Sequence, residues 1–240
     1  MKGTKFVEYN REKYPITLTY SAKRRTVGLT VKATGEVLLR IPLGYPEEDA
    51  LSFAQSKADW IAKHVIKFRA QEKTARTYND GDTISFLGSL YTIRRREGTN
   101  ARAIFNGTDL EITIPASFNE TDATKTARAA IIYLFIRTGI ERLKPEVEKY
   151  AKACGVETPP LRIWKQETKW GCCTPKNGII LNVKILLAPP VVITYLIVHE
   201  VSHLKFRNHQ AVFWNEVERL MPNYREAEAL LKTEGRNWEF

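Results

Sequence analysis

The chain has 240 residues, of which 43% are hydrophobic and 27% charged, and its formal net charge is +10. This length allows one large domain or two small ones, and this composition is that of an ordinary globular protein. The first twenty residues contain no apolar signal segment, and the longest apolar run, residues 129–136, is far shorter than the ~20 residues of a transmembrane helix. We therefore expect a soluble, cytoplasmic protein with no membrane partner.

The positive charge gathers in two clusters, Lys23–Arg25 and Arg94–Arg96. Such charge suits an anionic partner, either a nucleotide or a nucleic acid, and it equally suits a solvated basic surface. Neither cluster lies in a helix-turn-helix or zinc-finger pattern. We therefore expect at most a weak association of the basic surface with nucleic acid.

The three cysteines, Cys154, Cys172 and Cys173, do not make a disulfide framework or a zinc knuckle. Their odd number agrees with a reducing compartment. A cysteine nucleophile is disfavoured, because the histidines that would activate it are better used as metal ligands.

The first half of the chain is rich in predicted strands. Alternating apolar residues predict three strands within residues 14–43, and Pro46 with the acidic residues after it begins a helix that runs to about residue 73. Further strands are predicted at residues 83–86, 91–95, 101–105 and 110–114, with a hairpin turn at Asn106-Gly107. Pro115 closes this β-rich module, which we place at residues 1–118.

The second half, residues 119–240, is mainly helical. Residues 121–152 show one long helical pattern, with Gly139 and Pro145 as candidate breaks. Short extended segments follow at 161–166, 168–172 and 178–185. A buried helix then covers about 190–206, and a last helical pattern ends near residue 232. The sequence shows no internal repeat. The expected fold class is α+β, a β-rich N-terminal module followed by a domain with a small sheet, a metal-binding helix and a C-terminal helix.

The most informative segment is residues 199–209, His-Glu-Val-Ser-His-Leu-Lys-Phe-Arg-Asn-His, which holds three of the four histidines. On a helix, His199 and His203 lie one turn apart on one face and can bind one metal ion. Glu200 can then reach a metal-bound water as general base. Apolar neighbours on every side predict that this helix is buried, and a buried Glu needs a cation as its partner.

The third ligand is predicted to be His209. The three histidines match the first, fifth and eleventh places of the long metzincin zinc signature, but Phe206 stands where that signature has a glycine at the turn. Asn208 is a plausible residue for this turn and for the N-cap of the next helix, which would place His209 in that helix's first turn. The carboxylates of Glu216 and Glu218 remain as rival ligands.

Three neighbours, Trp170, Asn182 and Tyr195, can be assigned to the site or to the scaffold. For Trp170 and Tyr195 we favour packing in the core, and for Asn182 a turn or sheet-edge role is as good as substrate binding. The sequence therefore assigns no substrate-binding residue.

Several motifs in one order resemble the YgjP-like metallopeptidase-domain family of predicted metal-dependent hydrolases, distant relatives of the SprT and Spartan proteases. The motifs are Trp170-Gly171-Cys172, residues 178–182, residues 198–204, Asn208-His209, Phe213-Trp214 and Leu220-Met221-Pro222. The resemblance covers about residues 20–232 and implies a zincin fold, with zinc on His199, His203 and His209 and with Glu200 as base. Cys172 stands where family members usually have Ser, so no role for a hydroxyl is expected there.

Three functions compete. The favoured one is a zinc-dependent metallopeptidase with a metal-bound water activated by Glu200. The alternative is a nucleoside triphosphate pyrophosphohydrolase of the UTP type, an activity associated with a bacterial branch of the family; the net charge of +10 favours it and the absence of a Gly-rich phosphate loop opposes it. The third is a non-enzymatic, zinc-stabilised binding module, which would need a fourth protein ligand. One zinc ion is the expected cofactor, although Ni, Co or Mn can occupy such ligands. The oligomeric state is not predicted.

Overall fold

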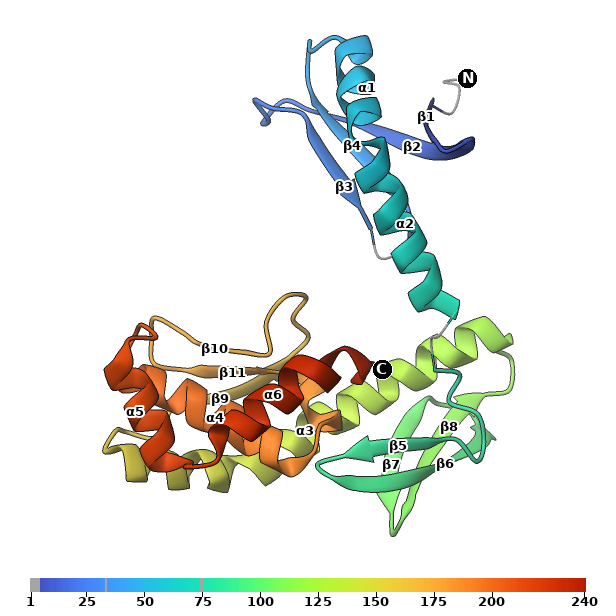
Figure 1. The fold of residues 1–240 in the computed structure, drawn as a ribbon. Helices are drawn as coiled ribbons and strands as arrows, with labels where there is room; N and C mark the ends of the chain where they lie inside the picture. The colour runs from blue at the N-terminus through green and yellow to red at the C-terminus, as the bar shows by residue number, and fades with distance from the viewer. Residues whose placement is uncertain (1–4, 33, 74–75) are drawn as a thin grey trace. The chain divides into compact units, whose positions relative to one another are not determined.

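The computed structural model describes residues 5–32, 34–73 and 76–240. The chain forms two compact units, Met1–Arg76 and Thr77–Phe240, which are described separately (Figure 1). No helix in these described ranges is both long enough and apolar enough to cross a membrane.

The first unit is a four-stranded sheet with two helices. Its strands are β1 (Lys5–Tyr9), β2 (Glu12–Ser21), β3 (Gly28–Val31) and β4 (Val37–Pro42). They lie in the order β1-β2-β4-β3, with β2 and β4 parallel and the outer pairs antiparallel. Apolar residues of the sheet and of both helices form one core.

The two helices of the first unit are α1 (Glu47–Ser56) and α2 (Ala58–Lys73). The sequence predicted one continuous helix here, which is wrong, because the helix is interrupted at Lys57. The backbone N–H of Lys57 donates to Ala54 O and closes the last turn of α1. Strand β1 was not predicted.

The second unit begins with a sheet of the same topology. Its strands are β5 (Thr83–Phe86), β6 (Ser89–Gly98), β7 (Arg102–Asn106) and β8 (Asp109–Pro115). Their order is β5-β6-β8-β7, again with a parallel central pair between antiparallel outer pairs. The four predicted strands and the turn at Asn106-Gly107 are confirmed, and Gly107 takes the left-handed conformation that this turn requires (φ +59°).

One helix, α3 (Glu120–Cys154), extends through the second unit (Figure 1). The Asn119 side chain accepts the N–H of Asp122 at its start, and Gly155 with φ +75° ends it. Neither candidate break interrupts it, since Gly139 and Pro145 both lie inside the helix.

The reason for Gly139 is close packing. A Cβ atom there would lie 2.9 Å from Leu186 and 3.0 Å from Ile163, so the absence of a side chain lets these residues approach the helix. The glycine is therefore a packing residue of α3 and not a helix break.

The β5–β8 sheet shares its core with α3, which changes the division of the chain. Phe86 of β5 packs on Phe135 of α3 with ring centroids 4.4 Å apart, and Ile112 of β8 belongs to the same buried cluster. The compact units consequently divide between residues 76 and 77, whereas the sequence placed the division between 118 and 119. Pro115 therefore marks the end of strand β8, which packs in the same core as α3, and not the end of a separate module.

The rest of the second unit is a small sheet and a group of helices. The sheet contains β9 (Leu161–Trp164), β10 (Gly171–Cys173) and β11 (Ile179–Asn182) in the order β10-β11-β9, and the 3-10 helix η1 (Val183–Leu187) follows it. The helices are α4 (Pro190–Lys205), α5 (Ala211–Leu220), α6 (Tyr224–Glu234) and the short 3-10 helix η2 (Gly235–Asn237).

Helix α4 packs against α3, α5, α6 and β10 and is buried on most of its surface. The last predicted helix is in fact two helices, separated at Met221-Pro222. The α+β class, with a small sheet beside a buried helix and helices at the C-terminus, is confirmed (Figure 1).

Glu216 of α5 links three helices near the end of α3. Nε and Nη2 of Arg219 donate to its two oxygens, each at 2.9 Å, while Lys205 Nζ and Cys154 Sγ each lie 3.4 Å from Oε1. The hydrogen bonds from Arg219 lower the pKa of Glu216 to about 2. Burial raises the pKa of Cys154 to about 11, so its thiol stays protonated and donates to the carboxylate.

Replacing Glu216 with Gln should destabilise the second unit by about 2 kcal/mol at pH 7, because the charge-assisted bonds to Arg219 are lost. A carboxyl group whose folded pKa lies below its ordinary value of 4.5 contributes stability that is fully present above pH 4.5. That contribution is lost as the pH falls toward 2.

Urea unfolding of the parent protein and of Glu216→Gln between pH 7 and pH 3 measures this effect. The difference between their free energies of unfolding should become smaller below pH 4.5. The control is Glu218→Gln, whose partner Arg225 is largely exposed, and which should change stability by less than about 1 kcal/mol. A difference that stays constant over this range would contradict the assignment to the ionised carboxylate.

Candidate metal centre

Helix α4 holds two of the three predicted ligands. Pro190 lies at its first turn, and the following residues are mostly buried apolar side chains, so the helix is fixed inside the second unit. His199 and His203 follow one another on one face, with ring centroids 4.9 Å apart.

The chain then returns so that His209 reaches the same place. Its Nε2 lies 3.1 Å from Nε2 of His199, and its ring centroid lies 4.6 Å from that of His203. One ligand atom from each histidine lies within 4.8 Å of the others. The structure thus brings together all three residues that the sequence proposed as ligands.

The turn between the helices differs from the prediction. Phe206 ends α4 in an extended conformation (φ −127°, ψ 106°), so its place in the signature does not need glycine. Asn208 does not take the left-handed conformation, and Gln210, not Asn208, is the N-cap of α5. His209 consequently lies just before α5 and not in its first turn.

The donor set fits a metal ion. Nδ1 of His203 lies 3.0 Å from the carbonyl oxygen of Phe206, and a bond donated there leaves Nε2 as the metal-binding atom. Burial, together with the charges of His203 and His209, lowers the pKa of His199 to about 3. The imidazole of His199 is therefore neutral at pH 7, which is the form that binds metals, and its Nε2 faces that of His209.

Glu200 lies beside this group and is 3% exposed. Burial raises the pKa of its carboxyl group to about 7, while a bond from the backbone N–H of Cys173 and the charge of Lys169 lower it. Its Oε2 has no hydrogen-bond partner within the described part of the chain. A buried carboxylate is unfavourable without a partner, and a cation on the three imidazoles would be that partner.

The carboxylate of Glu200 lies at the outer edge of β10. Asn182 N donates to Trp170 O, and Thr174 N to Gly178 O, so these groups face the neighbouring strand β11. In an antiparallel ladder the intervening Cys173 N–H points to the other side, and there it meets Glu200. β10 is the edge strand of its sheet.

Gly171 is required where β10 meets this carboxylate. A Cβ atom at residue 171 would lie 2.7 Å from Oε1 of Glu200, closer than such atoms approach. This role of Gly171 was not predicted from the sequence. Neither were the roles of the Cys173 N–H and the Phe206 carbonyl, because backbone groups carry no residue-type signal.

The rival ligands lie elsewhere. Glu216 is held by Arg219, and Glu218 is paired with Arg225 at the surface. In the described residues, the group able to hold a metal includes the three histidines and neither carboxylate.

Two of the ambiguous neighbours have structural contacts. Tyr195 is 4% exposed and packs its ring 6.3 Å from that of Tyr224 and 5.8 Å from that of His199. Asn182 donates its amide to the carbonyl oxygens of Gln166 and Lys169 and so fixes the loop before β10.

The family model for the YgjP-like metallopeptidase domain matches residues 25–234. The chain belongs to the YgjP-like metallopeptidase-domain family. Membership supports a metal-dependent hydrolase and implies a bound metal ion. A search of curated proteins finds no match. Among solved structures, the YgjP-like chain is similar to the metallopeptidase zymogen abylysin of Pyrococcus abyssi, with 23% identity over 38% of this chain and 95% of that one, at a TM-score of 0.35.

Gly171→Ala in this YgjP-like domain should lower hydrolytic turnover at least tenfold while metal content is unchanged, because the added methyl group displaces Glu200 and leaves the histidines in place. Casein turnover and metal content by atomic emission measure the two effects. Gly178→Ala is the matched control, since its Cβ would meet only Thr174 Oγ1 at 3.2 Å and Pro160 O at 3.6 Å. Equal losses in both variants would show a general effect on the β10–β11 hairpin.

His209→Ala should weaken metal binding at least tenfold without unfolding the protein, because His209 is exposed and supplies one of three ligands. Competition with a chromogenic chelator gives the affinity, and thermal unfolding of the metal-free protein gives the stability. Glu218→Ala, which removes a rival ligand, should bind metal as the parent does. Weaker metal binding by Glu218→Ala, together with unchanged binding by His209→Ala, would make Glu218 the third ligand in place of His209.

Proposed function

We propose that this protein is a zinc-dependent peptidase in which His199, His203 and His209 hold the metal and Glu200 moves the proton. The observation that carries the proposal is the convergence of three imidazoles beside a buried carboxylate at the edge of a β-sheet. A metal ion, a base and a strand edge are the three parts that peptide hydrolysis by a metalloenzyme needs.

Zinc is the metal that this donor set favours, since three imidazoles and an open fourth position are typical of catalytic zinc sites. When bound, zinc supplies Lewis acidity, which activates water and polarises the scissile carbonyl group. The three histidines fix its place. The bond between Nδ1 of His203 and the carbonyl of Phe206 orients that ring toward it.

Glu200 performs the proton transfers. One face of its carboxylate is fixed by the backbone N–H of Cys173, and Oε2 is free to receive a proton. As water adds to the carbonyl carbon, Oε2 takes its proton, and as the C–N bond breaks the same proton passes to the leaving amine. Gly171 leaves the space in which the carboxylate sits.

The outer edge of β10 is the proposed place of the substrate backbone. Along the described chain, β10 pairs only with β11, so its other edge can pair with an extended peptide as an added strand. Because Glu200 lies on that edge, an added strand passes directly beside the base.

The alternative substrate, a nucleoside triphosphate, has less support. Each arginine of the Arg94–Arg96 cluster is already paired with a carboxylate, and the partners are Asp109, Glu120 and Glu111. These charges are therefore partly compensated and not poised to bind phosphates. The non-enzymatic interpretation is disfavoured too, since no fourth side chain joins the three histidines in the described residues.

The decisive experiment compares the zinc-loaded protein with Glu200→Gln. The variant should keep its metal and lose at least about a hundredfold in casein cleavage, because the general base is removed. Glu218→Gln, the same change at an exposed position of α5, is the control and should keep full activity.

A second arm offers nucleoside triphosphates and measures released phosphate and pyrophosphate. Release that depends on Glu200, with casein intact, would replace the peptidase assignment with that of a pyrophosphohydrolase. Full casein cleavage by Glu200→Gln would remove Glu200 from the mechanism.

A further inference from the structure

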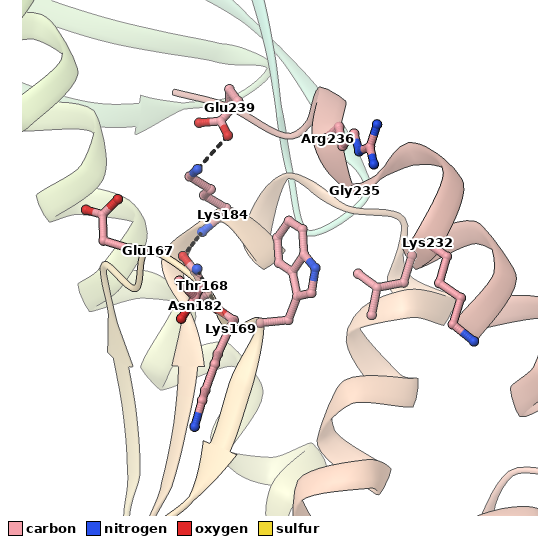
Figure 2. A pocket seen from close by; sticks show the side chains of 11 residues that line it. Glu167, Thr168, Lys169, Asn182, Lys184, Lys232, Gly235, Arg236 and Glu239 are labelled. Atoms are coloured by element: carbon pink, nitrogen blue, oxygen red, sulfur yellow. Dashed lines mark hydrogen bonds and ion pairs between the residues drawn. The ribbon is translucent and has the colours of Figure 1, made fainter. Parts of the chain in front are cut away.

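A pocket of about 310 Å³ lies in the second unit beside the C-terminal segment (Figure 2). Three parts of the second unit form it: the loop before β10, the end of β11 with η1, and the C-terminal end of α6 with the segment after it. The lining includes Lys169, Trp170, Asn182, Lys184 and Arg236.

The pocket carries an excess of positive charge. Four basic and two acidic side chains line it, and both acids have a basic partner: Glu239 pairs with Lys184, and Glu167 with Lys165. Figure 2 shows the bond between Lys184 and Glu239. Lys169 and Arg236, by contrast, have no ion pair in the described chain, although the charge of Lys169 also acts on Glu200. Two cations are therefore available to an anionic ligand.

The walls of the pocket are held in place before any ligand binds. Trp170 packs against Gly235, where a Cβ atom would lie 2.8 Å from the indole, and meets Trp238 edge-on at 5.7 Å. Asn182 fixes the opposite wall by its bonds to the carbonyls of Gln166 and Lys169. A preformed pocket loses little freedom on binding, which favours affinity.

The pocket and Glu200 are linked along the chain by residues 169–171. Lys169 lines the pocket, and Gly171 touches the carboxylate of Glu200. Two residues of extended chain span at most about 7 Å. A peptide that runs along β10 past Glu200 would therefore bring a side chain to the pocket within two or three residues of the bond that is cleaved.

We propose that this pocket is a specificity subsite that binds an acidic side chain of the peptide substrate, with Lys169 and Arg236 as its cationic partners. The inference rests on the proposed peptidase function. A volume of about 310 Å³ is at the lower limit of ligand pockets and has room for one acidic side chain.

Profiling of cleavage sites tests the proposal. The zinc-loaded full chain is incubated with a peptide library made from a protein digest, and the products are sequenced by mass spectrometry. We expect Asp and Glu to be enriched at one position, two or three residues from the cleaved bond. Lys169→Gln and Arg236→Gln should lose this enrichment. Arg236→Gln should also keep its cleavage of neutral peptides, whereas the charge removed in Lys169→Gln acts on Glu200 as well.

The matched controls are Lys125→Gln and Arg137→Gln, which remove the same charges from exposed positions on α3, outside the pocket. Both should keep the enrichment. Wild-type protein that cleaves peptides with no preference for acidic residues, or pocket variants that keep the preference, would overturn the proposal.

Binding separates this proposal from the peptidase assignment. Fluorescence anisotropy with zinc-loaded Glu200→Gln compares two labelled peptides that differ only in having three Glu or three Gln residues. The acidic peptide should bind about tenfold more tightly, as expected for charge-assisted bonds, and the advantage should vanish in Glu200→Gln combined with Arg236→Gln.

Acidic binding that depends on the pocket, without cleavage by the active protein, would support the subsite and reject the peptidase. Peptide cleavage by the active protein, without preferential binding of the acidic peptide, would support the peptidase and reject the subsite. Tight binding of a nucleoside triphosphate that is lost with Arg236, together with equal binding of the two peptides, would replace the side-chain carboxylate with phosphate and overturn the proposal.

Discussion

The feature on which the site depends is the burial of Glu200 without an ion-paired basic side chain. Its carboxylate is 3% exposed, receives one backbone N–H, and leaves Oε2 without a partner in the described residues. A carboxyl group so placed takes up a proton, as its pKa of about 7 allows, or keeps its charge when a cation compensates it. The imidazoles of His199, His203 and His209 converge where such a cation would bind. The unfavourable burial of the proposed base and the proposed binding of a metal therefore compensate each other.

The elements around α4 follow from this constraint. Helix α4 is apolar on most faces, and it is therefore buried against α3, α5, α6 and β10, which exclude water from it. β10 then has to come close enough for the N–H of Cys173 to reach the carboxylate, which requires glycine at residue 171. The same close approach places the base on an open strand edge. One short strand therefore protects the carboxylate and, in the proposed peptidase, also offers an edge to an extended substrate.

The helical spacing of the histidines allowed part of the site to be predicted from the sequence. The part that depends on the backbone conformation of a turn could not be predicted. The spacing of His199 and His203 fixes their relation on any helix, so two of the proposed ligands and the proposed base follow from the sequence. The position of His209 depends on a turn whose form no residue type dictates: Phe206 is simply extended, and its carbonyl orients His203. The predicted cap at Asn208 failed because Gln210, which makes no side-chain cap bond, begins α5.

The division of the chain was missed for a different reason. The strands β5–β8 were predicted correctly, but strand patterns do not tell which helix covers a sheet. Phe86 and Phe135 are 49 residues apart in sequence and meet in one core, which places the sheet with the second unit. Likewise, the sheets β1–β4 and β5–β8 have the same strand order and no visible sequence repeat. Many apolar patterns satisfy one topology, so topology can recur where residue identity does not.

The net positive charge of the surface and the two cations that line the pocket have different consequences for binding. A net charge of +10 spread over a surface attracts any polyanion, and ion pairs such as those of Arg94–Arg96 reduce that attraction. Lys169 and Arg236 differ because they line a walled pocket, and a loop fixed through Asn182 joins this pocket to Glu200 along the chain. A rigid loop keeps the distance from pocket to base constant. In an extended substrate alternate side chains point to opposite faces, so this fixed distance would select an acidic residue at one position relative to the cleaved bond.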